Sequence, residues 1–326
     1  MKSFLKSPLF RVLISASALG AMLFLMRDKI HEASGILHKE VLWSWIGVGT
    51  ATYFVAILFM AFRLQIVCRV QAVVMNFAEA SYLSFVGLFF NLFFPSAIGG
   101  DIAKTYYIYK HSGKKLESMT SVIMDRMMGV VSMALMALAA VWLFSRQIED
   151  PRINVMVCVF MAAMLLGLFF IFNKAFARRF KFLIAWLPST NLKARLVDFY
   201  HAFHGYKNHK AAFAASVALS VIGQSLFIWV YYLVALSLNV PISPAVFFML
   251  VPMVSVLSMM PSIGGLGVRE AGVVYFFKAH MPSERALALS LLLDMLIYGY
   301  SFAGGLLYAA AGGLKKKGDL REGIPT

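Results

Sequence analysis

The feature that most constrains this chain is a series of apolar stretches, each about as long as a helix that crosses a bilayer. A transmembrane helix needs about 20 predominantly apolar residues. The stretches are continuously apolar rather than alternating, which excludes a transmembrane β-barrel. They are Leu9–Met26, Val41–Phe62, Ala80–Tyr109, Thr120–Phe144, Ile153–Phe172, Ala211–Leu238, Ala245–Phe277 and Arg285–Gly313.

Composition indicates the same fold class. Hydrophobic residues make up 61% of the chain and charged residues 14%, whereas soluble domains are about half apolar and about a quarter charged. A soluble protein this apolar could not cover its surface with polar groups. Backbone polar groups within lipid must be satisfied internally, so we expect an all-α integral membrane protein. A single membrane domain over residues 1–326 should contain six to eight transmembrane helices.

Two of the stretches are too long for one crossing and are interrupted by proline and glycine. The interruptions resemble each other, because residues 94–100 read FPSAIGG and residues 260–265 read MPSIGG. We interpret Pro95 and Pro261 as structural hinges and the nearby glycines as points where the backbone can approach a ligand closely. These glycines are Gly99, Gly100, Gly264, Gly265 and Gly267.

The distribution of Lys and Arg between the apolar stretches predicts the orientation in the membrane. Cytoplasmic loops carry an excess of these residues. All the basic segments can lie on the cytoplasmic side only if each interrupted stretch returns to the side of the membrane from which it starts. A re-entrant hairpin does this. On this rule the cytoplasmic segments are the N-terminus, 63–79, 110–118, 174–210 and the short tail 314–326, and the external loops are 27–40, 145–152 and 239–244.

This orientation predicts six crossings and two hairpins that enter from opposite faces. Residues 1–150 and 151–313 would then be inverted repeats, each with one broken helix. Inverted repeats whose broken helices meet near the midplane are an architecture of transporters. The alternative is eight ordinary crossings in a protein that follows the charge rule weakly.

Charged residues within membrane segments are costly and often functional. Asp101 and Lys104 lie one helical turn apart, directly after the first glycine pair. The structural alternative is an N-cap aspartate beside a lysine that extends to the interface. Asp125 and Arg126 are adjacent near the start of another stretch. They are candidates for substrate binding and coupling, and the alternative is an interfacial ion pair.

The second interruption carries its own charges. Arg269 and Glu270 are adjacent in an otherwise uncharged stretch that begins at residue 211, and the alternative to a functional role is a pair that neutralises itself. The N-terminus of a half-helix attracts anions, so with Lys104 or Arg269 the site suits a phosphate. Asp294 lies within the last stretch, where its partner is Arg269 or Lys104. A coupling role and a structural role both stay open for Asp294.

Motifs of other chemistries are absent from the sequence. It contains no nucleotide-binding loop, kinase signature or HExxH metalloprotease motif. His201, His204 and His209 cluster in a basic segment, but a metal site there would need converging ligands and usually a carboxylate or thiolate nearby. An amphipathic, lipid-facing stretch is the better interpretation. We expect no metal, no cofactor and no nucleic-acid partner.

Several of these motifs resemble those of a known family. The matching pieces are residues 91–95, 99–101 with Lys104, 125–126 and 261–270. In this order they resemble the lysylphosphatidylglycerol synthase transmembrane (flippase-like) family of bacteria and archaea, and the block GGLGVRE at 264–270 is the most specific. The family usually has Arg where Lys104 stands and Glu where Asp125 stands. The Lys104 difference puts bidentate phosphate binding there in doubt.

The resemblance implies a lipid translocase-like membrane domain. The soluble aminoacyltransferase domain of the lipid-modifying members is not expected here, because the chain ends at Thr326. We therefore expect a non-enzymatic, multi-pass protein of a bacterial or archaeal inner membrane, with both termini cytoplasmic. Its substrate would be a phospholipid or a lipid-linked sugar.

The expected site combines both interruptions. Lys104 and Arg269 would neutralise the phosphate, Arg126 would also bind the substrate, and Asp101 and Glu270 would orient the cations or carry protons. The alternative function is a non-transporting accessory protein that presents lipid to a cell-envelope glycosyltransferase or another enzyme, or docks that enzyme.

Overall fold

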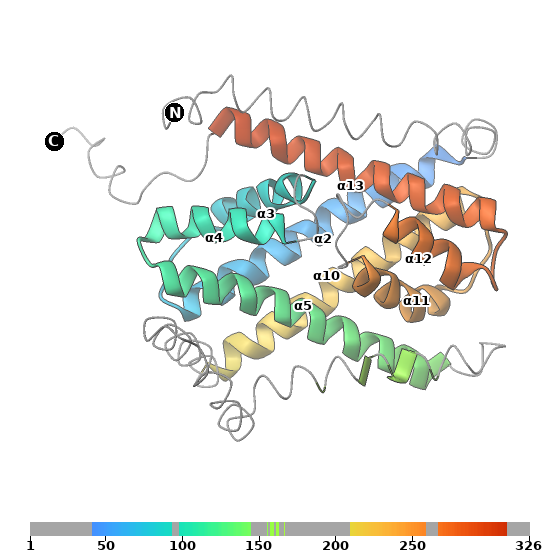
Figure 1. The fold of residues 1–326 in the computed structure, drawn as a ribbon, viewed down its shortest axis with the longest axis horizontal. Helices are drawn as coiled ribbons and strands as arrows, with labels where there is room; N and C mark the ends of the chain where they lie inside the picture. Colours follow the sequence, from blue (N-terminus) through green and yellow to red (C-terminus); the bar gives the residue numbers. More distant parts are fainter. Residues whose placement is uncertain are drawn as a thin grey trace, which may run out of the picture.

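The computed structural model describes residues 41–92, 98–144, 209–258 and 267–311, together with a few positions between 155 and 166. Four long helices run through this part of the chain (Figure 1), and they contain 28, 30, 28 and 29 residues. At 1.5 Å per residue each is more than about 40 Å long, which exceeds the roughly 30 Å of a bilayer's hydrocarbon core. They are α2 (Trp43–Val70), α5 (Lys115–Phe144), α10 (Lys210–Ser237) and α13 (Ser283–Ala311).

All four long helices are also apolar enough to cross a membrane. The other described helices contain only 10 to 15 residues, or at most about 23 Å, so none of these can span a bilayer alone. The predicted all-α membrane fold is confirmed. The short helices are α3 (Phe77–Asn91), α4 (Gly99–Ser112), α11 (Pro244–Leu257) and α12 (Val268–Phe277).

The short helices form two pairs, and each pair begins and ends at one end of the molecule (Figure 1). For α3 and α4, the Lys114 ammonium donates to the Ala72 carbonyl at 3.1 Å, which brings together the segments before α3 and after α4. For α11 and α12, the Arg285 guanidinium donates to the Asn239 carbonyl at 3.2 Å and does the same at the opposite end. Neither pair crosses the molecule, so the hairpin interpretation fits these two segments and the eight-crossing alternative does not.

Local sequence explains where the short helices start and stop. Asn76 and Glu79 form a reciprocal capping box at the start of α3, with hydrogen bonds of 2.8 and 2.7 Å. Gly113 ends α4 with a φ of 74°, a left-handed conformation that glycine adopts without a steric penalty. Pro244 is the first residue of α11, where its missing N–H costs no hydrogen bond.

The interruptions lie where the prolines and glycines predicted them. The breaks fall between α3 and α4 and between α11 and α12. Pro95, Pro261, Gly264 and Gly265 lie outside the described residues, as do the stretch Leu9–Met26, most of Ile153–Phe172, the three clustered histidines except His209, and the tail. The inverted repeat and the division into residues 1–150 and 151–313 stay predictions, because the first stretch of each half lies largely in these ranges.

One predicted boundary is wrong. The second stretch was expected to end at Phe62 and to be followed by a cytoplasmic loop, but α2 continues to Val70. The residues after Arg63 are again apolar, so the helical pattern tolerates one arginine. Arg63 is consequently buried, with 6% of its surface exposed.

Glycines allow the first helix pair to pack closely against its neighbours. A Cβ atom on Gly304 of α13 would overlap the backbone of Phe85 in α3, and a Cβ atom on Gly305 would lie 2.7 Å from the Phe89 ring. A Cβ atom on Gly100 would overlap the carbonyl oxygen of Gly87. Small residues at such crossings let helices in membranes approach closely enough for backbone contact.

We expect Gly304→Ala to destabilise the protein by about 1–3 kcal/mol, because the added methyl group forces α13 away from the backbone of α3. Gly299→Ala is the matched control, since a Cβ atom there meets nothing within 4 Å in the described structure. Denaturation of the purified protein in detergent, followed by tryptophan fluorescence, measures both variants. Equal stability of the two would show that the α3–α13 contact is not tight.

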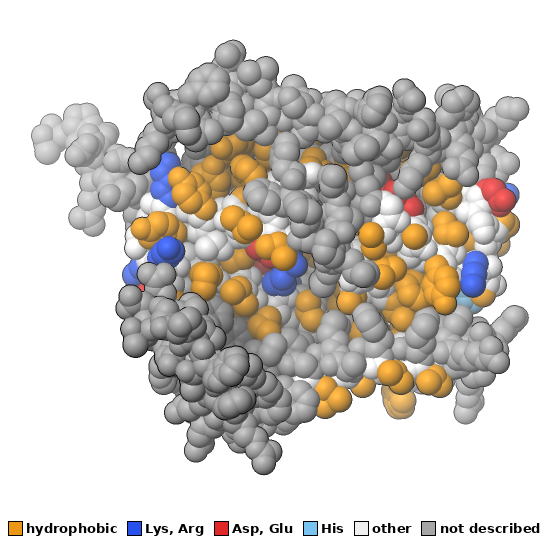
Figure 2. All heavy atoms as spheres, viewed as in Figure 1, with side chains coloured by type: hydrophobic (Ala, Val, Ile, Leu, Met, Phe, Trp, Pro, Cys, Tyr) orange, Lys and Arg blue, Asp and Glu red, His pale blue; other side chains and the backbone are white. Residues whose placement is uncertain are grey.

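The surface is that of a protein surrounded by lipid. In the face that Figure 2 shows, hydrophobic side chains cover much of the described surface between the two ends. Trp142 is 82% exposed and Trp43 60% exposed, at the end of the molecule where α2 begins and α5 ends (Figure 1). Tryptophans are enriched at membrane interfaces, so both side chains are suited to anchor this end of the molecule at the membrane surface.

Basic residues gather at the opposite end. Those that are exposed there lie where α2 and α4 end and where α5 and α10 begin. By the charge rule this end faces the cytoplasm, and that orientation stays a prediction. These residues are Arg69, Lys110, Lys114, Lys115 and Lys210.

Candidate functional site

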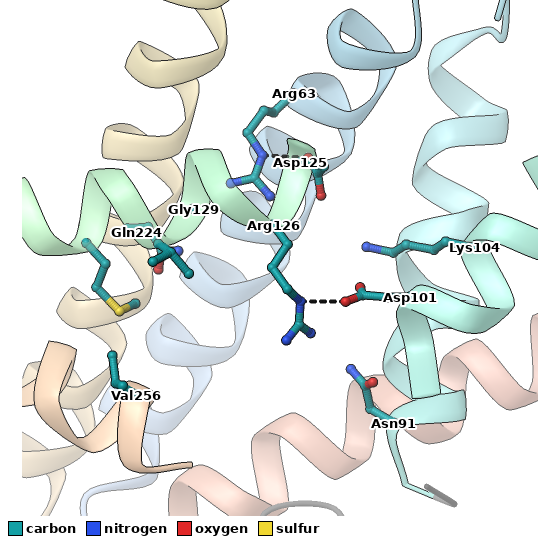
Figure 3. A pocket seen from close by; sticks show the side chains of 11 residues that line it. Arg63, Asn91, Asp101, Lys104, Asp125, Arg126, Gly129, Gln224 and Val256 are labelled. Carbon is teal, nitrogen blue, oxygen red and sulfur yellow. Dashed lines mark hydrogen bonds and ion pairs between the residues drawn. The ribbon is translucent and has the colours of Figure 1, made fainter. Parts of the chain in front are cut away.

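A charged cavity of about 200 Å³ lies between α2, α4, α5 and α10, beside the inner ends of α3 and α11 (Figure 3). Figure 2 shows basic and acidic side chains together near the middle of a largely apolar face, in the region of α4 and α5. The cavity is lined by Arg63, Asn91, Asp101, Lys104, Asp125, Arg126, Gly129, Val130, Met133, Gln224 and Val256.

One ion pair at the cavity is buried. Arg63 Nε donates to Asp125 Oδ1 at 2.6 Å, and their side chains are only 7% and 8% exposed. Arg63 Nη1 also donates to the Ser220 hydroxyl at 3.1 Å. A Cβ atom on Gly129 would lie 3.1 Å from Arg63 Nη1, so the absence of a side chain there makes room for the guanidinium. These contacts hold the Arg63–Asp125 pair in one arrangement.

A second ion pair is more accessible. Arg126 Nε lies 2.5 Å from Asp101 Oδ2, and the two side chains are 32% and 25% exposed. Figure 3 shows Arg126 extending from α5 toward Asp101 on α4. Asp125 and Arg126 therefore do not form the interfacial pair considered from the sequence. Each of them pairs with a residue of a different helix, and together they join α5 to α2 and α4.

Lys104 points into the same cavity from α4 (Figure 3). Within the described ranges, its ammonium makes no hydrogen bond or ion pair within 4 Å. Its alkyl chain lies against α3, because a Cβ atom on Gly87 would be 2.7 Å from Lys104 Cε. A glycine at position 87 thus makes room for the Lys104 side chain beside α3. Lys104 faces a cavity inside the protein, so the alternative of a lysine reaching the membrane interface does not describe it.

The start of α4 does not have the aspartate N-cap that the sequence left as the structural alternative. Asp101 is not the N-cap, because α4 begins at Gly99 and its N-cap is Ile98. The backbone N–H of Gly100 donates instead to Asn91 Oδ1 at 2.7 Å. The Gly100 N–H was expected to be available to a ligand, but Asn91 already accepts its hydrogen bond. This leaves the Asp101 carboxylate to pair with Arg126.

The charges of the second interruption form a separate cluster. Arg269 Nη1 donates to Asp294 Oδ1, in an ion pair whose side chains are 12% and 1% exposed. Asp294 therefore has Arg269, not Lys104, as its partner. Glu270 is 3% exposed and accepts from the backbone N–H of Gly267 at 2.6 Å. Arg269 and Glu270 thus do not simply neutralise each other, because each has a partner of its own.

Gly267 has a structural reason to be glycine, because its φ is 83°, in the left-handed region that disfavours side chains. Its N–H is occupied by Glu270 and so is not presented to a ligand. The cavity lining among the described residues does not include Arg269, Glu270 or Asp294. Among the described residues, the charges of the two interruptions therefore lie in two groups, a cavity at α4–α5 and an ion pair at α12–α13.

Four of the five described charged residues that line the cavity were predicted from the sequence as site residues, whereas Arg63 and the uncharged Asn91 and Gln224 were not. Arg63 was assigned to a loop because it follows an apolar run of ordinary length, although the run resumes after it. Asn91 was recognised only as part of a family motif. Gln224 lies in a stretch without charged residues, between Gly223 and Ser225. For Arg63 and Asn91, a polar residue with apolar neighbours on both sides was the available signal.

Comparison with protein-family models gives a match along most of the chain. A family model described as the lysylphosphatidylglycerol synthase TM region matches residues 9–305. That range includes every described element that lines the cavity. No curated protein matches the chain.

Proposed function

This chain belongs to the family of the lysylphosphatidylglycerol synthase TM region, and from that premise we propose that it is a flippase-like transporter. It would move the anionic headgroup of a phospholipid or a lipid-linked sugar between the two leaflets. The family model covers a transmembrane region and not the catalytic synthase domain, so we propose no enzymatic reaction. The proposed location is a bacterial or archaeal inner membrane, with both chain termini in the cytoplasm.

The observation that carries this proposal is the charged cavity among the membrane helices. A headgroup that crosses a bilayer must leave water, and an isolated charge in a low-dielectric interior costs several kcal/mol. Lys104 and Arg126 offer positive charge to an anion at the cavity. Ionisable groups that face a cavity between transmembrane helices often mark a substrate path.

The roles of the cavity residues follow from their exposure. Arg126 and Lys104 would contact the phosphate, because both reach the accessible part of the cavity. Asp101 would orient Arg126 in the absence of substrate. The buried Arg63–Asp125 pair would join α2 to α5 and is too enclosed to contact a headgroup directly. Asn91 would fix the start of α4, and with it the position of Asp101 and Lys104.

Reconstitution into liposomes tests the proposal. Vesicles with fluorescently labelled phospholipids and labelled lipid-linked sugars in one leaflet are scored for exchange to the other. We expect wild-type protein to accelerate exchange of at least one anionic lipid. Arg126→Met and Lys104→Met should each slow that exchange at least about tenfold, since each loses a charge-assisted hydrogen bond worth roughly 1.5–3 kcal/mol.

Lys110→Met is the matched control, because Lys110 lies on the same helix as Lys104 but is exposed and does not line the cavity. It should exchange lipid at the wild-type rate. If wild-type protein exchanges no tested lipid, or if both cavity variants exchange it at the wild-type rate, the proposal is wrong. Lipid binding without exchange would instead support the accessory protein that presents lipid to an envelope enzyme.

A further inference from the structure

The cavity's charges do not balance, and the imbalance suggests what it selects. Among the described residues that line it, three are cations, namely Arg63, Lys104 and Arg126, and two are the carboxylates Asp101 and Asp125. The described lining therefore carries one net positive charge. The segments between α3 and α4 and between α11 and α12, residues 93–97 and 259–266, contain no ionisable side chain in their sequences.

We propose that this cavity is a site for a singly charged phosphodiester and discriminates against headgroups with two or more negative charges, such as lipid-linked diphosphates. The inference rests on the proposed function and narrows its substrate class. One phosphodiester anion would make the occupied site electrically neutral. A diphosphate would leave at least one negative charge uncompensated among apolar helices, where unpaired charge is strongly unfavourable.

The arrangement of the ion pairs also indicates that one positive charge is left without a partner carboxylate. The Arg63–Asp125 pair is buried and held by Ser220, so its two charges stay matched to each other. The Arg126–Asp101 pair is partly exposed and can admit a ligand beside it. Lys104 is then the cation whose charge no described carboxylate balances within ion-pair distance. The site thus has one positive charge to offer to an incoming anion.

The size of the cavity fits a headgroup rather than a whole lipid. Pockets that enclose a drug-sized molecule have volumes of roughly 300–1,000 Å³, whereas this cavity has about 200 Å³. A single phosphodiester with its nearest substituents is much smaller than such a molecule. The acyl chains would remain outside, against the apolar surface that surrounds the cavity (Figure 2).

Equilibrium binding to purified protein in detergent tests this inference. The probes are dihexanoyl phosphatidylglycerol, which carries one negative charge, and farnesyl diphosphate, which carries at least two. The ratio of their dissociation constants is compared between variants, so differences between the lipid tails cancel. Asp101→Asn raises the net charge of the cavity by one, and we expect it to shift this ratio toward the diphosphate by about tenfold, a change that corresponds to about 1.4 kcal/mol.

Two further variants complete the experiment. Glu284→Gln removes one exposed carboxylate at the start of α13 and should leave the ratio unchanged. Lys104→Met makes the cavity neutral, and it should weaken binding of both probes and bind the diphosphate least well. It tests the inference even if Asp101→Asn does not fold.

The results separate the inference from the proposed function. Charge-selective binding without lipid exchange in liposomes would support the site and reject the transporter. Lipid exchange combined with a ratio that neither Asp101→Asn nor Lys104→Met alters would reject the inference and keep the transporter. The inference is also wrong if wild-type protein binds neither probe.

Discussion

Asp125→Leu is expected to destabilise this protein by about 3–5 kcal/mol, because it leaves the Arg63 guanidinium buried without its carboxylate partner. Arg63 is 6% exposed, and Asp125 is 5% exposed. The variant also leaves three cations against one carboxylate around the cavity. The free energy of unfolding, measured by denaturant titration of the detergent-solubilised protein, gives the size of the effect.

The double variant Arg63→Met with Asp125→Leu is the informative control. Replacing both partners of a buried ion pair by apolar residues is often neutral or stabilising, so the double variant should be more stable than Asp125→Leu alone. Asp101→Leu breaks the more exposed pair with Arg126 and should cost less, because solvent can compensate the remaining charge. If Asp125→Leu is as stable as wild type, the buried pair does not hold α2 to α5.

Asp294→Leu is expected to have an effect of similar size at the other hairpin, again about 3–5 kcal/mol. Asp294 is fully buried, and it pairs with Arg269 of α12. The tyrosines at positions 53, 231 and 298 are electrostatic neighbours of the same guanidinium, and they offer it no full negative charge. The loss of Asp294 therefore leaves a cation enclosed between α12, α13 and two further helices.

The double variant Arg269→Met with Asp294→Leu separates structure from function at this hairpin. We expect it to recover stability relative to Asp294→Leu and to keep the charge selectivity of lipid binding, because neither residue lines the cavity. Exchange in liposomes is measured on the same protein. Loss of charge-selective binding in the stable double variant would show that Arg269 takes part in substrate binding, as the sequence alone suggested.

The difference between prediction and structure at this hairpin has a clear cause. Arg269 and Glu270 are adjacent in sequence, and in a helix adjacent side chains do not face each other. Glu270 turns back to the N–H of Gly267, whereas Arg269 reaches Asp294, 25 positions later in the chain. The sequence narrowed the partner of Asp294 to two cations. The choice between them depended on which helix α13 packs against.

At the cavity, too, helix packing decided which charged residues became partners. The sequence identified Asp101, Lys104, Asp125 and Arg126 as charges in unusual places, and all four line it. It did not identify Arg63, because one arginine after a run of apolar residues is also what the end of a transmembrane helix looks like. The partner of Arg63 is 62 positions away, and no local pattern connects the two.

The sequence by itself determined the class of fold and the positions of its breaks. Long apolar runs can only be helices in lipid, and proline with glycine interrupts a helix wherever it falls. Only the tertiary structure decided which charges neutralise one another and which remain to face the cavity. That outcome depends on the close contact of α4 with α3, at Gly87 and Gly100, and of α5 with α2, where Gly129 makes room for Arg63. Contacts between helices distant in sequence are set by the shapes of both surfaces, which one stretch of sequence does not specify.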